Sequence, residues 1–461
     1  MWVADFETCD MWEPSSSDEI PHQRVWLAGI MNLEDMKLKY FTSLDDFMKF
    51  ILSKQDNKNR EIAFHNLKFD GSFIIPWLFE HGYVHVTEKP EPKQFSTLID
   101  ERNNWYSITI QVNKRIKVLI WDSLKLFPTA LEYLHEFYHT PSRKIKEDDA
   151  FYNQIRPIDH IPTEQELKYL ENDLRVLAET LREHIKYYGL RFKKTQAGQS
   201  FYNFEKSFPH WRYRFPPLSV EEDELIRPAY WGGISYVNPK IAGKDIYGID
   251  VFDINSSYPY QLASKKLPYG KPVLRTGQGL HPDMSKFWVA EAIVRFKLKE
   301  DHIPCIPLKA VVEGRPITTE KWLSDSQGLV KIRFSCIDYL TILDSYDFEV
   351  ISWEWAIHWA WKKHKEVAEF IYKNNEIKVK YKKLAQETDD EELKAEYLTR
   401  SNQAKINNNA FYGKFGEEIV KRGKTPHYDK EKGVVYRVDR VEEIPDNKKK
   451  FLPVAIATTS W

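Results

Sequence analysis

Four acidic residues near the start of the chain have the composition of a metal site. Asp5 and Glu7 stand in "DFET", Asp70 ends "NLKFD", and Asp173 ends "YLEND", which begins with Tyr169. Taken singly, each acid fits an ordinary turn or a solvated helix position. Together, four carboxylates repel one another unless cations lie between them, and two bound cations are the arrangement used for phosphodiester hydrolysis. The acids and the phenol therefore predict a two-metal hydrolytic site.

Strand patterns in the first 125 residues provide one support for this site. Residues 1–8 predict a strand, on which Asp5 and Glu7 share a face because side chains alternate along a strand. Residues 24–32 predict a second strand, and residues 106–124 predict a hairpin that turns at its central Asn-Lys pair. A mixed sheet is expected here.

A helix provides the second support. Residues 163–188 begin with a capping box of Thr163 and Glu166, and Tyr169 and Asp173 are four residues apart and so share a helix face. Leucines recur at helical spacing, at Leu167, Leu170, Leu174, Leu177 and Leu181. The strand face and the helix face can border one cleft.

Composition limits the class of protein. The 461 residues suffice for roughly three domains. A net charge of −1 means that any polyanion site must come from local patches. Three separated cysteines argue against a disulfide framework or a zinc site, and no apolar run is long enough to span a membrane. We expect a multidomain protein of a reducing cytoplasm.

A second set of residues lies in the other half of the chain. "FDINSSYPY" places Asp253 at the end of a predicted apolar strand. Further on, Lys405, Asn409 and Tyr412 recur at i, i+4 and i+7 and therefore project together from a helix.

Two helices, 361–386 and 391–412, are predicted to carry the second of these groups. The connection between them, "QETDD", is short enough to make them an antiparallel pair, and Thr388 with Glu391 predicts a capping box. The first helix is rich in lysine, and the two helices carry local positive charge.

The motifs "DFET", "NLKFD" and "YLEND", in this order, resemble the three exonuclease motifs of family B DNA polymerases, in particular the protein-primed branch of small bacteriophages and linear plasmids. The resemblance implies that Asp5, Glu7, Asp70 and Asp173 bind metal and that Tyr169 positions water. It implies that the frayed 3′ end of DNA contacts Thr8, His65, Asn66, Phe69, Ser123 and Leu124. The family's exonuclease lysine corresponds to Lys144 or Lys146, since a small length difference leaves both possible, and we favour Lys146.

Polymerase motifs of the same family also have counterparts. "YWGG" resembles the linker motif, which implies DNA contacts by Tyr230, Gly232 and Gly233; "DINSSYP" resembles the motif with the first palm aspartate. Asp253 would bind metal, and Tyr258 would exclude a ribose 2′-hydroxyl, although Ser257 departs from the usual leucine. The fingers motif "KINNNAFYGKFG" and "FIYKNNEIK" imply nucleotide contacts by Lys405, Asn409, Tyr412 and Lys378.

The resemblance implies an α/β and α+β multidomain fold, in which a ribonuclease H-like 3′-5′ exonuclease domain precedes a partial right-hand polymerase domain. The expected segments are the exonuclease 1–188, a connection 189–229, the linker motif and first palm part 230–264, a terminal-protein and DNA-binding insertion 265–360, fingers 361–416, a processivity and strand-displacement hairpin 417–450, and a return to the palm 451–461.

A second palm carboxylate is missing from the pattern. The family carries it in an Asp-Thr-Asp segment, which these residues do not contain. We expect a truncated or split reading frame whose missing C-terminal segment, separately encoded, completes the palm. The alternatives are a stand-alone 3′-5′ exonuclease and a non-catalytic accessory that binds DNA or a terminal protein.

The resemblance further implies two Mg²⁺ or Mn²⁺ ions for each active site. The expected partners are template and primer DNA, dNTPs and a priming terminal protein. The expected location is the cytoplasm of a host cell that carries the virus or plasmid.

Overall fold

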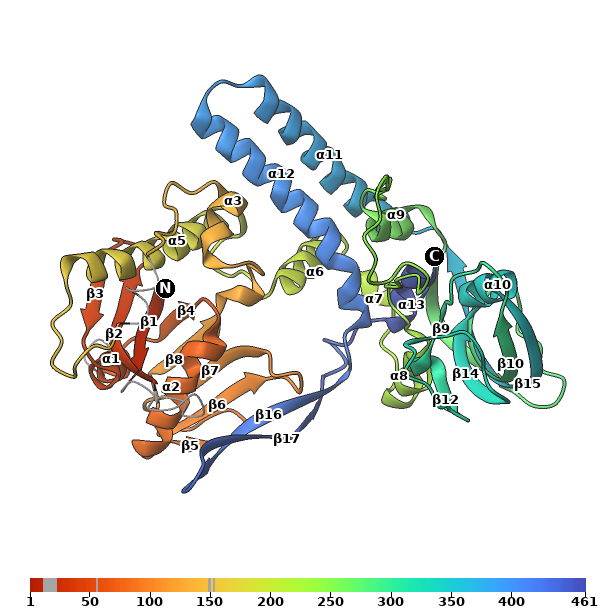
Figure 1. Cartoon of the computed structure of the whole chain (residues 1–461), viewed down its shortest axis with the longest axis horizontal. Helices are drawn as coiled ribbons and strands as arrows, with labels where there is room; N and C mark the ends of the chain where they lie inside the picture. Colours follow the sequence, from red (N-terminus) through yellow and green to blue (C-terminus); the bar gives the residue numbers. More distant parts are fainter. Residues whose placement is uncertain (11–22, 55–56, 148–150, 152–153) are drawn as a thin grey trace. The chain divides into compact units, whose positions relative to one another are not determined.

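The computed structural model describes residues 1–10, 23–54, 57–147, 151 and 154–461 (Figure 1). Contacts divide the chain into two compact units. The first comprises Met1–Gln199, Lys380–Asn402 and Lys421–Glu442, and the second comprises Ser200–Val379, Gln403–Val420 and Glu443–Trp461.

An eight-stranded mixed sheet forms the centre of the first unit, in the order β3-β2-β1-β4-β8-β7-β6-β5. Strand β1 lies between β2, which is antiparallel to it, and β4, which is parallel to it. The strands are β1 Trp2–Asp10, β2 Gln23–Asn32, β3 Leu38–Phe41, β4 Arg60–Phe64, β5 Val84–His85, β6 Gln94–Ile99, β7 Trp105–Gln111 and β8 Lys117–Asp122. The predicted strands and the hairpin turn between β7 and β8 are confirmed.

Helices cover both faces of this sheet. Helices α1 (Leu44–Ile51) and α2 (Leu67–Glu80) share one apolar core with Ala4 and Phe6 of β1. Helix α5 (Glu164–Tyr188) shares a second core with Val3. Because successive side chains of a strand point to opposite faces, the acids of β1 face the α5 side.

The predicted helix 163–188 is confirmed, together with its capping box. Its leucines pack against the sheet as the spacing predicted. Short helices among the described residues of this unit include η1 Ser123–Lys125, η2 Leu131–Tyr133 and α3 Leu134–Tyr138.

A hairpin of β16 (Val420–Asp429) and β17 (Gly433–Glu443) confirms the predicted two-stranded element. Most of it belongs to the first unit, where Tyr436 packs 5.4 Å from Trp105, centroid to centroid. Gly423 forms a bridge with Asp100.

A five-stranded antiparallel sheet, in the order β12-β14-β10-β15-β9, is central to the second unit. Its strands, with the separate pair β11 and β13, are β9 Leu267–Thr276, β10 Phe287–Leu298, β11 Ile306–Pro307, β12 Val311–Glu313, β13 Trp322–Leu323, β14 Val330–Ser335 and β15 Tyr346–Lys362. The short helices of this unit are α6 Gln196–Ser207, which begins in the first unit, α7 Trp211–Arg214, α8 Val220–Ile226, η3 Arg227–Ala229, α9 Ser257–Ser264, η4 Leu308–Ala310, α10 Cys336–Ser345, η5 Tyr412–Gly416 and α13 Leu452–Ser460.

The predicted antiparallel helix pair is present as α11 (Lys365–Glu387) and α12 (Glu391–Phe411). The amide of Asn408 donates to the carbonyl of Ile371 at 3.0 Å and joins the two helices. Helix α11 begins later than predicted because β15 continues to Lys362. The predicted capping box is wrong, because Asp390 caps α12 by accepting from the N–H groups of Glu392 and Leu393.

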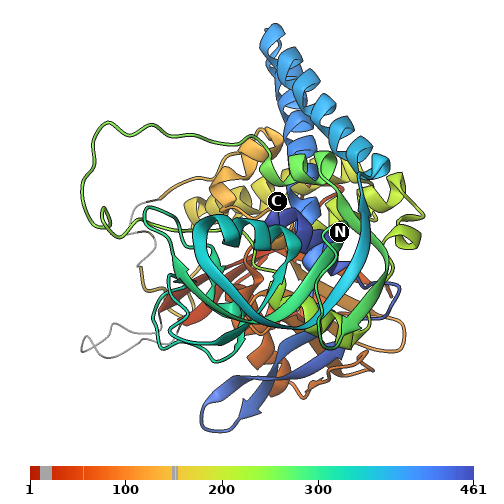
Figure 2. The ribbon, with the colours of Figure 1, turned by 90° about the vertical axis from the view of Figure 1, so that its right-hand side faces the viewer.

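The predicted strand before Asp253 is wrong. Residues 231–256 contain neither helix nor strand, and Figure 2 draws them as a long loop. Val251 and Phe252 are each 91% exposed, so the apolar pattern is not buried against any neighbour. A strand needs a hydrogen-bonded partner, and no described segment pairs with this one.

Cys9, Cys305 and Cys336 are buried, unpaired thiols. None of the helices in the described part of the chain combines the length and the apolar character that a membrane crossing requires.

Candidate active site

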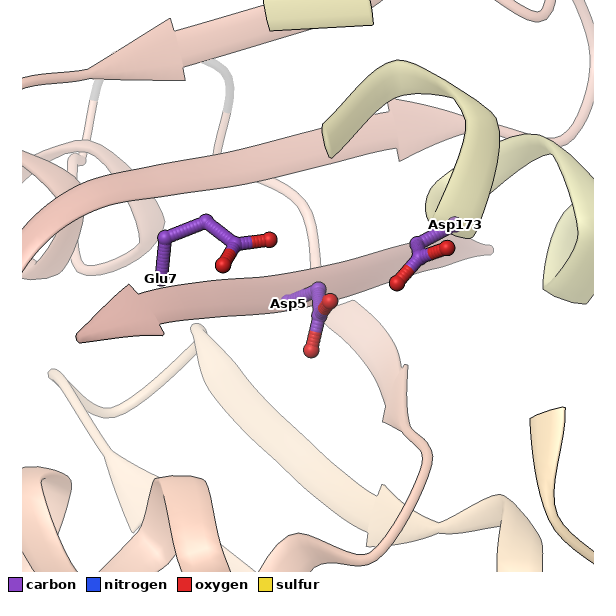
Figure 3. Close-up of side chains that lie close together, drawn as sticks. All are labelled: Asp5, Glu7 and Asp173. Atoms are coloured by element: carbon purple, nitrogen blue, oxygen red, sulfur yellow. The ribbon is translucent and has the colours of Figure 1, made fainter. Parts of the chain in front are cut away.

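Three of the predicted metal-binding carboxylates meet in the first unit (Figure 3). Asp5 and Glu7 project from β1, and Asp173 projects from α5, with one oxygen of each within 4.8 Å of the others. Among the described residues this is the one group of three potential metal ligands at such spacing. The strand face and the helix face predicted from the sequence therefore converge.

Asp70, the fourth predicted metal ligand, interacts electrostatically with Asp5 of this group. It lies in the first turn of α2 and is buried. Burial raises the pKa of Asp70 well above its usual value, and the nearby Asp5 carboxylate raises it further, while the N–H of Phe6 opposes the shift. We call Asp5, Glu7, Asp70 and Asp173 the carboxylate cluster.

The carboxylate cluster holds its negative charge poorly in the absence of cations. Burial raises the pKa of Asp5 to about 7, with a further contribution from Asp173. Burial raises the pKa of Glu7 to about 8, with further contributions from the charges of Asp5 and Asp173. The pKa of Asp173 is also raised by burial, against the opposing effect of Lys144.

These residues fit a divalent cation of the Mg²⁺ or Mn²⁺ type. Such ions prefer carboxylate oxygens, which this cluster supplies from three separate elements. One oxygen each of Asp70 and Asp173 is buried and accepts no hydrogen bond from the described residues. An unsatisfied buried carboxylate oxygen is costly, and metal coordination would satisfy it.

Without metal, the protein is expected to lose stability as the pH rises. An acid with a raised pKa stays protonated in the folded state after it has ionised in the unfolded chain. Each acid therefore destabilises the folded state as the pH rises from its ordinary pKa to its raised pKa. This pH window runs from 3.8 to about 7 for Asp5 and from 4.5 to about 8 for Glu7. Melting temperatures in EDTA should fall by several °C between pH 5 and pH 8, since about 1 kcal/mol corresponds to roughly 2–4 °C.

The matched variant is Asp5→Asn with Glu7→Gln, which keeps the shape and removes both charges. It should flatten this part of the pH dependence. Mn²⁺ should raise the melting temperature of the original protein at pH 8 and leave that of the variant unchanged. An equal Mn²⁺ effect on both proteins would show that the ion binds elsewhere.

Lys144, rather than Lys146, lies at the carboxylate cluster. The Lys144 ammonium contacts Asp173 Oδ2 and lies 5.1 Å from the centroid of the Tyr169 ring. Lys146 pairs with Glu132 at 2.5 Å, and its side chain is 74% exposed. The structure thus places Lys144, and not the favoured Lys146, against Asp173, while the role of exonuclease lysine stays a prediction. The N–H of Ile145, between them, donates to Asn172 on α5 at 2.8 Å.

Tyr169 lies on the same face of α5 as Asp173 and is buried. Its ring lies beside the Lys144 ammonium and packs against the ring of Phe151, with the two ring centroids 5.2 Å apart. The position beside the cluster agrees with the expected role of orienting water, which stays a prediction.

The predicted DNA-contacting residues differ in exposure. Phe69 is 42% exposed and Asn66 is exposed, as side chains that contact a DNA strand must be. Ser123 is fully buried and donates to the carbonyl of Phe64 at 2.8 Å, so its hydroxyl faces the protein interior. His65 Nδ1 lies 3.0 Å from that hydroxyl. A contact of Ser123 with DNA stays a prediction.

Asp122 holds the backbone beside the predicted DNA-contacting residues Asn66 and Leu124, and the sequence analysis did not single it out. One of its oxygens accepts from the N–H groups of both Asn66 and Leu124, each at 3.0 Å. It thereby ties the N-terminus of α2 to the end of β8. The sequence signal that could have identified it is an aspartate at the end of an apolar strand.

Thr8, another predicted DNA-contacting residue, lies on β1 next to Glu7 and is half-buried.

A second group of predicted residues meets in the second unit. The rings of Tyr258 and Tyr412 are stacked, with centroids 4.2 Å apart and an angle of 8° between them. A Cβ atom at Gly233 would lie 2.6 Å from the Tyr258 hydroxyl, and one at Gly416 would lie 2.7 Å from the Tyr230 ring. The glycines of the two motifs thus allow three tyrosines to pack closely. Gly232 has φ +76°, a conformation that favours glycine.

Lys405 and Asn409 are exposed on α12, about two turns and one turn before Tyr412, respectively, and Lys378 is half-buried on α11. Asp253 is exposed within the 231–256 loop. It belongs to no group of three potential metal ligands among the residues described, so the structure does not bring the palm site together as it does the carboxylate cluster.

Comparison with known families identifies most of the chain. A family model described as DNA polymerase type B, organellar and viral, matches residues 51–167 and 142–446. The DNA polymerase of Bacillus phage phi29 is 29% identical over 469 residues, which cover 100% of this chain and 75% of the relative. The DNA polymerase of Streptococcus phage Cp-1 is 24% identical and is covered to 76% of its length.

Solved structures agree with the sequence comparison. Phi29 DNA polymerase complexed with primer-template DNA superimposes with a TM-score of 0.81 at 27% identity, over 100% of this chain and 75% of that one. The complex with primer-template DNA and incoming nucleotide substrates gives a TM-score of 0.82 at 28% identity, over 100% and 76%. The mixed α/β multidomain fold is shared along the whole chain, which spans about three quarters of the length of these relatives.

Proposed function

Because the chain belongs to the organellar and viral type B DNA polymerases, in their protein-primed branch, we propose that it is a DNA-directed DNA polymerase with 3′-5′ proofreading exonuclease activity. The observation that carries the exonuclease part is the carboxylate cluster, in which Asp5, Glu7 and Asp173 have oxygens within 4.8 Å of one another. Viral or plasmid DNA is the proposed substrate, in the host cytoplasm.

In the exonuclease, the carboxylate cluster would hold two Mg²⁺ or Mn²⁺ ions. When bound, such ions supply activation of water and stabilisation of charge on the leaving oxygen. Lys144 balances the charge of Asp173, Tyr169 orients water, and Phe69 and Asn66 hold the 3′-terminal nucleotides by stacking and hydrogen bonding.

For polymerisation, the support comes from the stacked Tyr258 and Tyr412 and from the exposed Lys405 on the same helix as Tyr412. We propose that Lys405 and Lys378 bind the triphosphate of an incoming dNTP as point charges. Asn409 and Tyr412 line the nascent base pair, Tyr258 excludes a ribose 2′-hydroxyl, and Asp253 binds metal. Tyr230, Gly232 and Gly233 approach the template strand.

The segments expected from the motifs are proposed as functional domains. A ribonuclease H-like exonuclease occupies residues 1–188, and a right-hand polymerase with palm and fingers follows. The five-stranded sheet, apart from the last two residues of β15, falls in the insertion 265–360, which is proposed to bind terminal protein and DNA. The β16–β17 hairpin falls in 417–450, which is proposed to provide processivity and strand displacement.

A second candidate function is 3′-5′ degradation alone. It is favoured by the contrast between the carboxylate cluster and Asp253, which is exposed and stands outside any three-ligand group of the described residues.

Single-stranded DNA labelled at its 5′ end should be shortened stepwise from its 3′ end when Mg²⁺ or Mn²⁺ is added. A phosphorothioate at the last 3′ linkage should block this degradation, and EDTA should abolish it. Loss of the 5′ label first, or no degradation with either ion, would overturn the exonuclease proposal. Extension of a primed template with dNTPs in the same assay would separate the two candidate functions.

A further inference from the structure

Arg156 is a buried cation that neither the motifs nor the proposed reaction uses. Its side chain is 2% exposed, and its Nε donates to Glu166 Oε1 at 2.7 Å. Glu166 lies three residues before Tyr169 and seven before Asp173, so all three project from neighbouring turns of one face of α5. The arginine is therefore bonded to the helix α5 close to Tyr169 and Asp173, which lie at the carboxylate cluster.

Arg156 also packs against β2, the strand that pairs with β1 at Glu7. Its guanidinium lies 4.3 Å from the ring centroid of Trp26 on β2. In the pairing of β1 with β2, Glu7 is opposite Leu27 and Thr8 is opposite Val25, so Trp26 is the extra residue of a β-bulge. Bulges are frequent next to active sites, where they can re-aim a side chain, and this bulge lies beside Glu7.

A third contact of Arg156 leads to Tyr169. Its Nη2 donates to the carbonyl of Phe151 at 3.0 Å, and its guanidinium lies 5.3 Å from the Phe151 ring. That ring packs against Tyr169. Arg24 of β2 donates to the carbonyls of Arg156 and of Pro157, so the backbone at this point is tied to the sheet as well.

From these contacts we propose that Arg156 is a positioning residue of the exonuclease site, which holds the bulge beside Glu7 in register with the helix that carries Tyr169 and Asp173. The inference rests on the proposed exonuclease function. A planar guanidinium suits this task because it can stack on Trp26 while it donates in three directions within its plane. A metal site needs ligands from β1 and α5 at a fixed separation, and the sheet's own hydrogen bonds do not set that separation.

A purely structural role is the alternative, since a buried ion pair between Arg156 and Glu166 contributes to stability on its own account. The two roles differ in what they change. A structural role alters the melting temperature only. A positioning role also alters Mn²⁺ affinity without DNA and the rate of excision, while it leaves the affinity for single-stranded DNA unchanged.

The test compares Arg156→Met with Arg60→Met. Arg60 is a matched control because it is also buried in the first unit and donates to the carbonyls of Ile51 and Ser53, at the opposite end of β4 from Asp70 and α2. Mn²⁺ binding is measured by calorimetry in the absence of DNA, and kcat and KM are measured on single-stranded DNA, at a temperature at which each variant is folded.

We expect Arg156→Met to weaken Mn²⁺ binding and to lower kcat by about 10- to 100-fold each, with KM unchanged, because residues that support metal ligands act on this scale. Arg156→Lys, which keeps the charge without the planar fork, should recover part of the loss. Arg60→Met should lower the melting temperature without either effect.

A folded Arg156→Met protein with unchanged Mn²⁺ affinity and kcat would overturn the proposal. If that variant does not fold, Arg156→Lys and Glu166→Gln decide: losses in both support the positioning role, and unchanged values in both overturn it. If the original protein neither binds Mn²⁺ nor degrades DNA, the exonuclease assignment itself fails, and the role of Arg156 fails with it.

Discussion

Replacing Asp5 and Glu7 together by alanine is expected to abolish metal-dependent degradation of single-stranded DNA. The two residues supply two of the three closely spaced oxygens of the carboxylate cluster, both from one strand face. Metal ions contribute several kcal/mol of transition-state stabilisation, and each 1.36 kcal/mol corresponds to a factor of ten, so the rate should fall by about 10³-fold or more. The rate is measured on end-labelled DNA with Mg²⁺ and with Mn²⁺.

DNA binding should survive this double substitution, because Phe69 and Asn66 lie on α2 and at its N-terminus rather than on β1. Fluorescence anisotropy in EDTA checks this. Asp10→Ala is the control on the same strand, and Asp253→Ala is the control in the second unit; both should degrade DNA at the original rate. Unchanged degradation by the double variant would remove the assignment of the site.

Lys144→Ala is expected to cause the next largest loss, of roughly 10²-fold, which is typical for removal of one fixed charge from an active site. Lys144 contacts Asp173 and lowers the pKa of Asp5, Glu7 and Asp173 against the larger effect of burial. Without it, these three pKa values rise further, so a larger fraction of the carboxyl groups is protonated at neutral pH. The pH profile of degradation should therefore shift to higher pH.

Lys146→Ala is the matched control two residues away. Its ammonium pairs with Glu132 at the surface, so the rate and the pH profile should stay close to those of the original protein. A larger loss from Lys146→Ala than from Lys144→Ala would mean that the segment 144–146 takes another position when DNA and metal are bound.

Local patterns in the sequence predicted much of the first unit. Alternation along β1 placed Asp5 and Glu7 on one face, and the leucine spacing of α5 together with its capping box placed Tyr169 and Asp173 on another. These features depend on the two short repeat distances of strands and helices, which are set by backbone sterics and by which face is buried. They can therefore be recognised without knowing the partner of either element.

The predictions that failed depend on contacts between distant residues. Composition suggested a strand before Asp253, but strand formation requires a neighbouring strand, and none of the described segments supplies one. Spacing left both Lys144 and Lys146 possible, because the contact of Lys144 with Asp173 depends on how its segment packs against α5.

The sequence by itself determined the family, the acids of the site and the two elements that carry most of them, because these are encoded in contiguous motifs and periodicity. Only the tertiary structure decided which lysine meets Asp173, that Ser123 faces inward, and that Arg156 joins the bulge at Trp26 to α5. The physical reason is that burial and ion pairing are properties of a residue's surroundings, and those surroundings include segments outside the residue's own helix or strand, in the case of Trp26 and Arg156 more than a hundred residues apart.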